Sequence, residues 1–190
     1  MSGNNLITAV STRPQAGSRT SAVIQNLIQS VDEMFSLNSD FFELSELSAS
    51  LRAASYRVEL AGPAKYALDS IEQSKLLIVG ISVKAPTGYP ALLRYLFEMA
   101  DPTALRAKPT LLIETHCNAS VAQGTELDIH MLMRSFELSV LSNMRVSSRE
   151  LLQGVMPGDG RVQSIVDALY DAGFNTNDPT DDQSGRVLIN

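Results

Sequence analysis

Six consecutive residues in the middle of the chain read Leu76-Leu77-Ile78-Val79-Gly80-Ile81. The run lacks the polar alternation of a half-exposed strand, so it predicts a strand buried on both faces, as in a parallel sheet. Similar runs precede and follow it, Leu6-Ile7-Thr8-Ala9-Val10 and Thr110-Leu111-Leu112-Ile113. Two weaker candidates complete a sheet of five strands, Phe41-Phe42-Glu43-Leu44 and Asn143-Met144-Arg145-Val146.

Segments whose apolar residues recur at helical spacing lie between these runs. The clearest stripe extends from Val23 to Val31, directly after Ser18-Arg19-Thr20. The same spacing predicts four more helices. The second holds Tyr66, Leu68 and Ile71 after Gly62-Pro63, and the third holds Leu92, Leu93, Leu96 and Phe97 after Pro90. The fourth covers about 126–138 with Leu127, Met131 and Leu138, and the fifth holds Val162, Ile165, Val166 and Leu169 between Pro157 and Gly173. Alternation of strands and helices predicts an α/β fold with right-handed crossovers. Five strands favour a flavodoxin-like three-layer αβα sandwich around a five-stranded parallel sheet.

The length of 190 residues suits one globular domain with a substantial core. We expect that domain to cover residues 1–173. Residues 174–190 are rich in Asn, Asp, Thr and Gly and are expected to form a flexible tail. In an alternative, the apolar Val187-Leu188-Ile189 of this tail docks on a neighbouring subunit.

Cysteine content and hydropathy predict a cytoplasmic protein. The single cysteine, Cys117, excludes a disulfide framework and a zinc cluster built from cysteines. No apolar run approaches the roughly 20 residues of a membrane span. The first residues lack the basic start and apolar centre of a signal peptide.

Charge is distributed unevenly along the chain. Of the net charge of −6, residues 1–120 carry −1, from 10 basic and 11 acidic side chains, and residues 121–190 carry −5, from 5 and 10. This balance excludes a polyanion such as nucleic acid, which requires clustered Lys and Arg. A single phosphate group is compatible with the nearly neutral part.

Ligands of open parallel sheets bind beyond the carboxyl ends of the strands, where the strand order reverses. The loops at this point begin at Ser11, Ser82 and Glu114. The first loop, residues 11–21, combines five hydroxyl side chains with two arginines before a helix, and a helix N-terminus suits a phosphate. Simple N-capping by Ser18 is the alternative. The loop is not a P-loop, since it lacks the Gly-Lys-Ser/Thr ending.

The second loop, residues 82–90, and the stretch after it contain, in order, Tyr89, Leu96-Phe97-Glu98, Asp101-Pro102, Ala104-Leu105 and Lys108-Pro109. The order and spacing of these residues resemble the NADPH-dependent FMN reductases of the flavodoxin-like superfamily, which include reductase partners of sulfonate monooxygenases. The first loop is similar to the family's phosphate signature through Ser11, Arg13, Ser18, Arg19 and Thr20. The resemblance covers about residues 5–170, and most of its Leu-Phe-Glu to Lys-Pro part is structural.

The resemblance implies an NAD(P)H:flavin oxidoreductase that passes a hydride from the nicotinamide to FMN. The five residues of the phosphate signature would hold the FMN phosphate. The residues expected to line the flavin ring are Ser82, Val83, Lys84, Ala85, Pro86, Thr115, His116, Cys117 and Asn118. No catalytic side chain and no metal are expected, because orientation and electrostatics are the protein's contribution to this chemistry. The resemblance does not decide whether the hydride donor is NADPH or NADH, or whether the flavin is FMN or FAD. It also leaves open whether the protein is a homodimer or a homotetramer, and whether a monooxygenase is its partner.

Three departures from the family pattern bear on the site. Val10 stands at a usual glycine. In the second loop Ser82 stands at a proline and Lys84 at the tyrosine or its neighbour, and the loop is one residue longer. The family's Thr-Gly-Gly loop against the flavin is replaced by Thr115-His116-Cys117 after Glu114, so both glycines have gained side chains. This change motivates an alternative from another class, a flavodoxin-like electron carrier or a non-catalytic scaffold subunit.

Four single residues carry alternatives of their own. His116 and Cys117 invite a nucleophile or metal role, but adjacent residues at a strand end seldom point the same way, so lining of the flavin pocket is favoured. Lys84 is either a phosphate or Glu114 partner or a surface lysine. The resemblance places His130 at a subunit interface, and a solvated or packing histidine is the alternative.

Overall fold

The computed structural model describes residues 6–12, 19–35, 38–83, 91–116, 129–147, 159–171 and 173–174. Its strands are β1 Leu6–Ser11, β2 Asn38–Glu43, β3 Leu76–Val83, β4 Pro109–His116 and β5 Ser139–Ser147. Its helices are α1 Arg19–Phe35, α2 Leu44–Ala53, α3 Gly62–Gln73, α4 Ala91–Glu98, α5 Pro102–Leu105 and α8 Asp159–Asp171, with a 3₁₀ turn η1 at Arg57–Glu59. Residues 129–135 form a further helix.

The strands form one sheet in the order β2-β1-β3-β4-β5, with every neighbouring pair parallel. This is the flavodoxin-like order, in which the order of successive strands across the sheet reverses between β1 and β3. All five strands expected from the apolar runs are present, so the predicted α/β fold is confirmed. The reversal places β1 inside the sheet, between β2 and β3.

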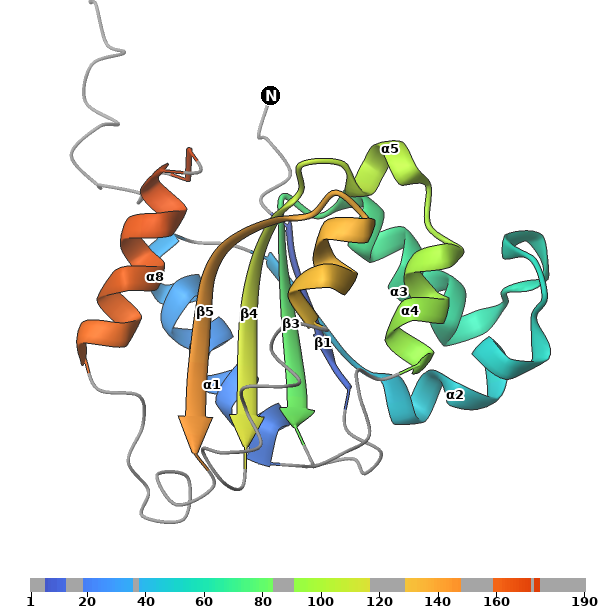
Figure 1. Cartoon of the computed structure of the whole chain (residues 1–190), viewed down its shortest axis with the longest axis horizontal. Coiled ribbons are helices and arrows are strands. Elements are labelled where there is room, and N and C mark those ends of the chain that lie inside the picture. The colour runs from blue at the N-terminus through green and yellow to red at the C-terminus, as the bar shows by residue number, and fades with distance from the viewer. Residues whose placement is uncertain are drawn as a thin grey trace, which may run out of the picture.

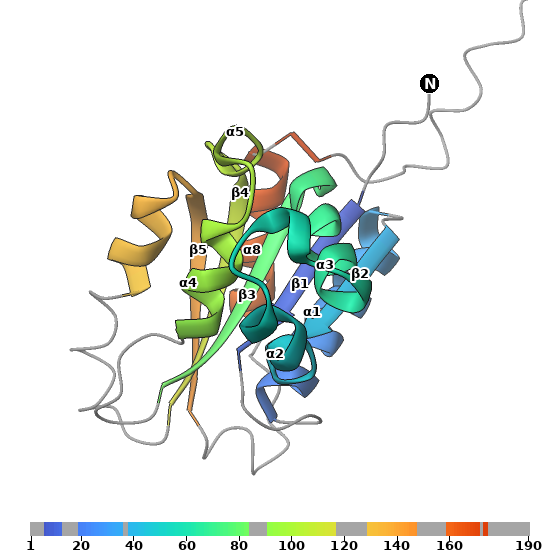
Figure 2. The same ribbon diagram turned by 90° about the vertical axis from the view of Figure 1, so that its right-hand side faces the viewer.

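Helices cover both faces of the sheet and make three layers (Figures 1 and 2). Figure 2 shows α2, α3 and α4 in front of the strands and α8 behind them. The first face buries Val10, Val79 and Leu112 against α2, α3, α4 and the helix over 129–135. The second face buries Ile78 and Ile113 against α1 and α8. Apolar burial on both faces explains why these strands lack polar alternation.

The edge pairing of β4 with β5 contains an irregularity. Thr110 pairs with Val140, whereas Leu111 pairs with Ser142, so Leu141 is an extra residue in β5. Such a bulge shifts the alternation of side chains along one strand. Beyond it, Asn143 lies beside Leu112 and Arg145 beside Glu114.

Several boundaries differ from the sequence prediction. Leu44, expected at the end of a strand, instead begins α2, where Leu44, Leu47 and Leu51 are buried at helical spacing. The helix expected over about 126–138 is described over 129–135, and Leu138 follows a turn in which its N–H donates to Met133 O. The short η1 and α5 were not expected, because each spans only about one turn and carries almost no periodic signal.

Helix α8 ends just before Gly173, the glycine at which the sequence predicted its end. Gly173 has a φ of +85°, the left-handed conformation that glycine adopts without strain. Phe174, placed at the start of the expected tail, is buried against α1 and α8, and its N–H donates to Leu169 O. The folded part therefore includes Phe174, and residues 175–190 lie outside the described residues.

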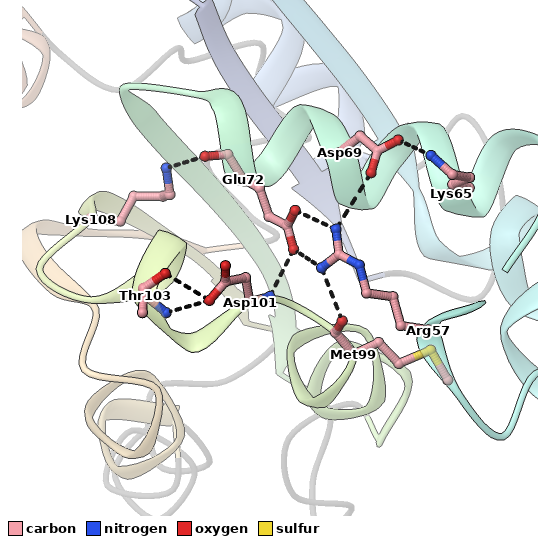
Figure 3. Close-up of polar contacts among 8 residues, drawn as sticks. All are labelled: Arg57, Lys65, Asp69, Glu72, Met99, Asp101, Thr103 and Lys108. Carbon is pink, nitrogen blue, oxygen red and sulfur yellow. Dashed lines mark hydrogen bonds and ion pairs between the residues drawn. The ribbon is translucent and has the colours of Figure 1, made fainter. Parts of the chain in front are cut away.

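A polar network joins α3, η1, α5 and the amino end of β4 (Figure 3). The guanidinium of Arg57 binds both carboxylate oxygens of Glu72, and Glu72 Oε1 also accepts the N–H of Asp101 at 2.7 Å. The Asp101 carboxylate caps α5 through Thr103 N and Oγ1. The ammonium of Lys108 donates to the carbonyls of Glu72 and Ser74. Main-chain groups at one edge of the sheet are thereby satisfied by side chains.

The network shifts the ionisation of its members. Hydrogen bonds from Thr103 hold the pKa of Asp101 below its ordinary value. The hydrogen bond with Glu72 raises the pKa of Arg57, and burial lowers the pKa of Lys108. Asp101, Lys108 and the prolines after them belong to the stretch that carries the family resemblance, so this part of the resemblance has a structural basis.

Among the described helices, none combines the length and the hydropathy that a bilayer span requires.

Glu72→Ala tests the importance of the network. The substitution removes the partner of Arg57 and leaves the N–H of Asp101 without its acceptor. We expect a loss of about 1–3 kcal/mol in the free energy of unfolding, measured by urea denaturation. Glu98→Ala is the control, because Glu98 pairs with Arg94 on an exposed helix surface and should cost less than about 0.5 kcal/mol. Equal losses in the two variants would contradict this account.

Candidate functional site

The carboxyl ends of β1, β3 and β4 meet at one edge of the sheet, where the arrowheads lie in Figure 1. Ser11 pairs with Gly80, and Ser82 pairs with Thr115. Beyond β1 the pairing continues by one hydrogen bond, because Thr12 N donates to Gly80 O at 2.9 Å. The three loops that the sequence singled out therefore leave the sheet side by side.

Gly80 determines how closely α1 approaches this edge. A Cβ atom at Gly80 would lie 2.1 Å from Ile24 Cδ1 and 3.3 Å from Thr20 Cγ2. Distances near 2 Å are not compatible with two carbon atoms, so the first turns of α1 rest on bare backbone of β3. This contact brings the amino end of α1 to the carboxyl edge of the sheet.

Buried hydroxyl groups join α1 to the strands. Thr20 Oγ1 lies 2.6 Å from Thr115 Oγ1, and Thr115 Oγ1 donates to Ile81 O at 3.3 Å. Ser11 Oγ lies 3.1 Å from Ser21 Oγ. Of the residues expected to bind a cofactor, Thr20 and Thr115 thus contact each other, and Ser11 contacts Ser21, the residue after Thr20.

The other expected cofactor residues are placed less completely. Ser82 is partly buried near the end of β3. Arg19 is the first residue of α1, and Val83 and His116 are the last residues of β3 and β4. Outside the described residues lie Arg13, Ser18, Lys84, Ala85, Pro86, Cys117 and Asn118. Their roles stay predictions.

Thr12 is one of the five hydroxyl residues of the first loop, but it was not among the five residues of the phosphate signature. Its side chain is only 9% exposed, and within the described part of the chain Thr12 Oγ1 has no hydrogen-bond partner. A buried hydroxyl with a free donor is costly unless a ligand or water accepts from it. The sequence signal was its position directly after a buried strand, at the start of a hydroxyl-rich loop.

A buried carboxylate lies on the other side of β4. The side chain of Glu114 is 0% exposed, and its Oε1 accepts from Asn143 Nδ2 at 2.8 Å. Asn143 Nδ2 also lies 3.3 Å from His130 Nε2, and Arg145 Nε lies 3.8 Å from Glu114 Oε2. The expected interface residue His130 therefore contacts Asn143 within its own chain. The group links the helix over 129–135 to the end of β4.

Within the described ranges, His, Cys, Asp and Glu side chains nowhere gather in threes or more in a way that could hold a metal ion.

Comparison with known proteins adds to this geometry. The chain is 37% identical over 98 residues to the NADH-dependent FMN reductase SfnF of Pseudomonas fluorescens (strain Pf0-1), which covers 52% of each protein. It is 34% identical over 109 residues to the FMN reductase (NADPH) of Pseudomonas aeruginosa, which covers 57% of this chain and 58% of the relative. The sequence is similar to FMN reductases. The chain matches about half the length of these curated relatives, and no family model matches it.

A solved structure supports the fold over nearly the whole chain. The apo form of the NADH:FMN oxidoreductase EMOB superposes with a TM-score of 0.73 and covers 93% of this chain and 92% of its own. Its sequence identity is 17%, so this likeness concerns the fold. The resemblance to FMN reductases and the flavodoxin-like fold are both confirmed.

Gly80→Ala tests the close approach of α1 to β3. The added Cβ overlaps Ile24, so we expect a loss of about 1–3 kcal/mol in the free energy of unfolding. Ile24→Val removes the Cδ1 atom and should cost about 1 kcal/mol alone. In the double variant the Ile24→Val change should recover part of the Gly80→Ala loss, as measured by urea denaturation. Strictly additive losses would contradict the overlap.

Proposed function

We propose that the protein is an NAD(P)H-dependent FMN reductase. The observation that carries the proposal is the placement of the amino end of α1 beside the ends of β1 and β3, where Thr12 Oγ1 is buried without a partner among the described residues. The relatives named as FMN reductases support the same activity.

The residues at this edge fit the phosphate of FMN. The first N–H groups of α1 lack partners within the helix, and the positive end of its dipole favours an anion. Thr12 offers a hydroxyl donor at the start of the same loop. Arg13, Ser18 and Arg19, which follow in the sequence, would add two positive charges and a further hydroxyl. An anion of this size needs no excess of basic residues over the whole chain.

The flavin ring would lie between the loops after β3 and β4, against Ser82–Pro86 and Thr115–Asn118. When bound, FMN supplies the redox chemistry by accepting a hydride from the nicotinamide of NADH or NADPH. The chain's own residues bind the phosphate, hold the ring loops at a fixed spacing and exclude water. These tasks need no side-chain acid or base, so the proposal assigns no catalytic residue.

The proposal also includes the extent of the domain, the location of the protein, its assembly and its partner. Residues 1–174 would form the reductase domain, with Phe174 included because it is buried in the core, followed by a tail. The protein would work in the cytoplasm as a homodimer or homotetramer and supply reduced flavin to a monooxygenase or another acceptor. The single cysteine and the resemblance to reductases of this kind support these points.

The replaced loop glycines favour a second candidate, a flavin-binding electron carrier or a scaffold subunit without catalysis. His116 and Cys117 stand where the family has small residues against the flavin ring. A ring that binds in a shifted position would preserve flavin binding and lose hydride transfer.

Titration of the purified full chain with FMN separates these candidates. We expect the bound-flavin absorbance spectrum to appear, the melting temperature to rise, and NADH or NADPH to be oxidised only when FMN is present. Flavin binding without NAD(P)H oxidation would identify the electron carrier. A protein with no flavin-induced thermal shift would contradict the reductase and favour the scaffold.

Ser18→Ala combined with Arg19→Ala tests the phosphate assignment. Loss of a charged hydrogen bond and a hydroxyl donor should weaken FMN binding by about 100-fold, measured as the dissociation constant. Arg106→Ala is the control, since Arg106 pairs with Glu137 near the opposite edge of the sheet and should leave FMN binding unchanged. An unchanged dissociation constant in the double variant would overturn the assignment.

A further inference from the structure

The hydroxyl hydrogens of Thr20 and Thr115 are both used inside the protein. Thr115 Oγ1 donates to the carbonyl of Ile81, which can only accept. With that donation in place, the hydrogen in the 2.6 Å contact between the two threonines comes from Thr20. A hydroxyl carries one hydrogen, so neither side chain retains a donor for a phosphate.

Burial leads to the same conclusion. The side chain of Thr20 is 0% exposed and that of Thr115 is 3% exposed. The two hydroxyls lie between the first turn of α1 and the ends of β3 and β4. They connect the helix end proposed for the phosphate to the strand end from which the ring loop leaves.

The end of β4 is held independently from its other face. Glu114, the residue before Thr115, accepts from Asn143 on β5 and pairs with Arg145 at 3.8 Å. These contacts do not involve α1. Loss of the Thr115 hydroxyl would therefore remove the hydrogen bond between α1 and β4 and leave β4 in place, while the Ser11 contact with Ser21 would still hold α1 beside β1.

We propose that Thr115 is a positioning residue that fixes the amino end of α1 against β4, so that the phosphate end and the ring end of the flavin site form one rigid unit. Thr20 is its partner in this contact and not a phosphate ligand through its side chain. The proposal rests on the proposed FMN site. It assigns to these residues a role in the geometry between the two ends of the ligand.

Paired titrations with FMN and riboflavin test this role. Riboflavin has the same ring and lacks the phosphate, so the ratio of its dissociation constant to that of FMN measures how well the phosphate end is aligned. Thr115→Val removes the hydroxyl at nearly constant shape. We expect this ratio to fall about tenfold, the effect of one well-placed hydrogen bond, and to recover in Thr115→Ser.

Thr8→Val is the matched control. Thr8 is a fully buried threonine of β1 whose hydroxyl lies 3.0 Å from Ser70 O and 2.7 Å from Ser70 Oγ, between the sheet and α3. This variant should lower the melting temperature and leave the riboflavin to FMN ratio unchanged. A control that lowers the ratio as much as Thr115→Val would overturn the proposal, because the effect would then be one of stability.

Thr20→Val removes the same contact from the side of the helix, and it replaces Thr115→Val in the test if that variant does not fold. The two single variants and their double variant should lower the ratio to the same extent, since all three remove one interaction. A fall in Thr20→Val without one in Thr115→Val would make Thr20 a phosphate ligand and overturn the proposal. If the parent protein binds both flavins and Thr115→Val keeps the ratio, only the positioning role fails. If the parent binds neither flavin, the FMN site and the positioning role fail together.

Discussion

The contact between Ile24 and the bare backbone of Gly80 determines where α1 begins relative to the sheet. Because no Cβ stands between them, the helix lies close enough for Thr20 to reach Thr115 on β4. The helix end then stands beside the point where the chain leaves β1 for the first loop. A larger separation would place the first N–H groups of α1 out of line with the strand ends. One glycine in a buried strand thus supports the geometry of the whole candidate site.

The sequence predicted the sheet well, because strands buried on both faces leave continuous apolar runs. Prediction failed where signals overlap or are short. Leu44 follows the strand candidate without a break, so its role as the first residue of α2 was hidden. For the site, the hydroxyl-rich loop was visible, but the directions of the hydroxyls were not. Whether Thr20 faces a ligand or Thr115 depends on a contact across 95 residues, and no local pattern encodes it.

The two edges of the sheet serve different purposes. At the amino edge, Arg57, Glu72 and Lys108 satisfy main-chain groups with charged side chains and fix α3 against the start of β4. At the carboxyl edge, Thr12 keeps an unpaired hydroxyl among the described residues. Stabilising contacts and the proposed ligand site thereby lie at opposite ends of the same strands. Motifs that resemble those of FMN reductases consequently fall into two groups, those that maintain the fold and those proposed to form the site.

The extra residue Leu141 also determines which side chains of β5 lie on each face of the sheet. If β5 paired regularly here, with Leu141 opposite Leu111, Met144 would lie beside Glu114 and Arg145 beside Thr115. The buried carboxylate would lose its cation, and a charge would enter the apolar layer beneath α1 and α8. The bulge at Leu141 therefore decides which face each later residue of β5 joins, and loss of the bulge with all residues kept would exchange the two faces.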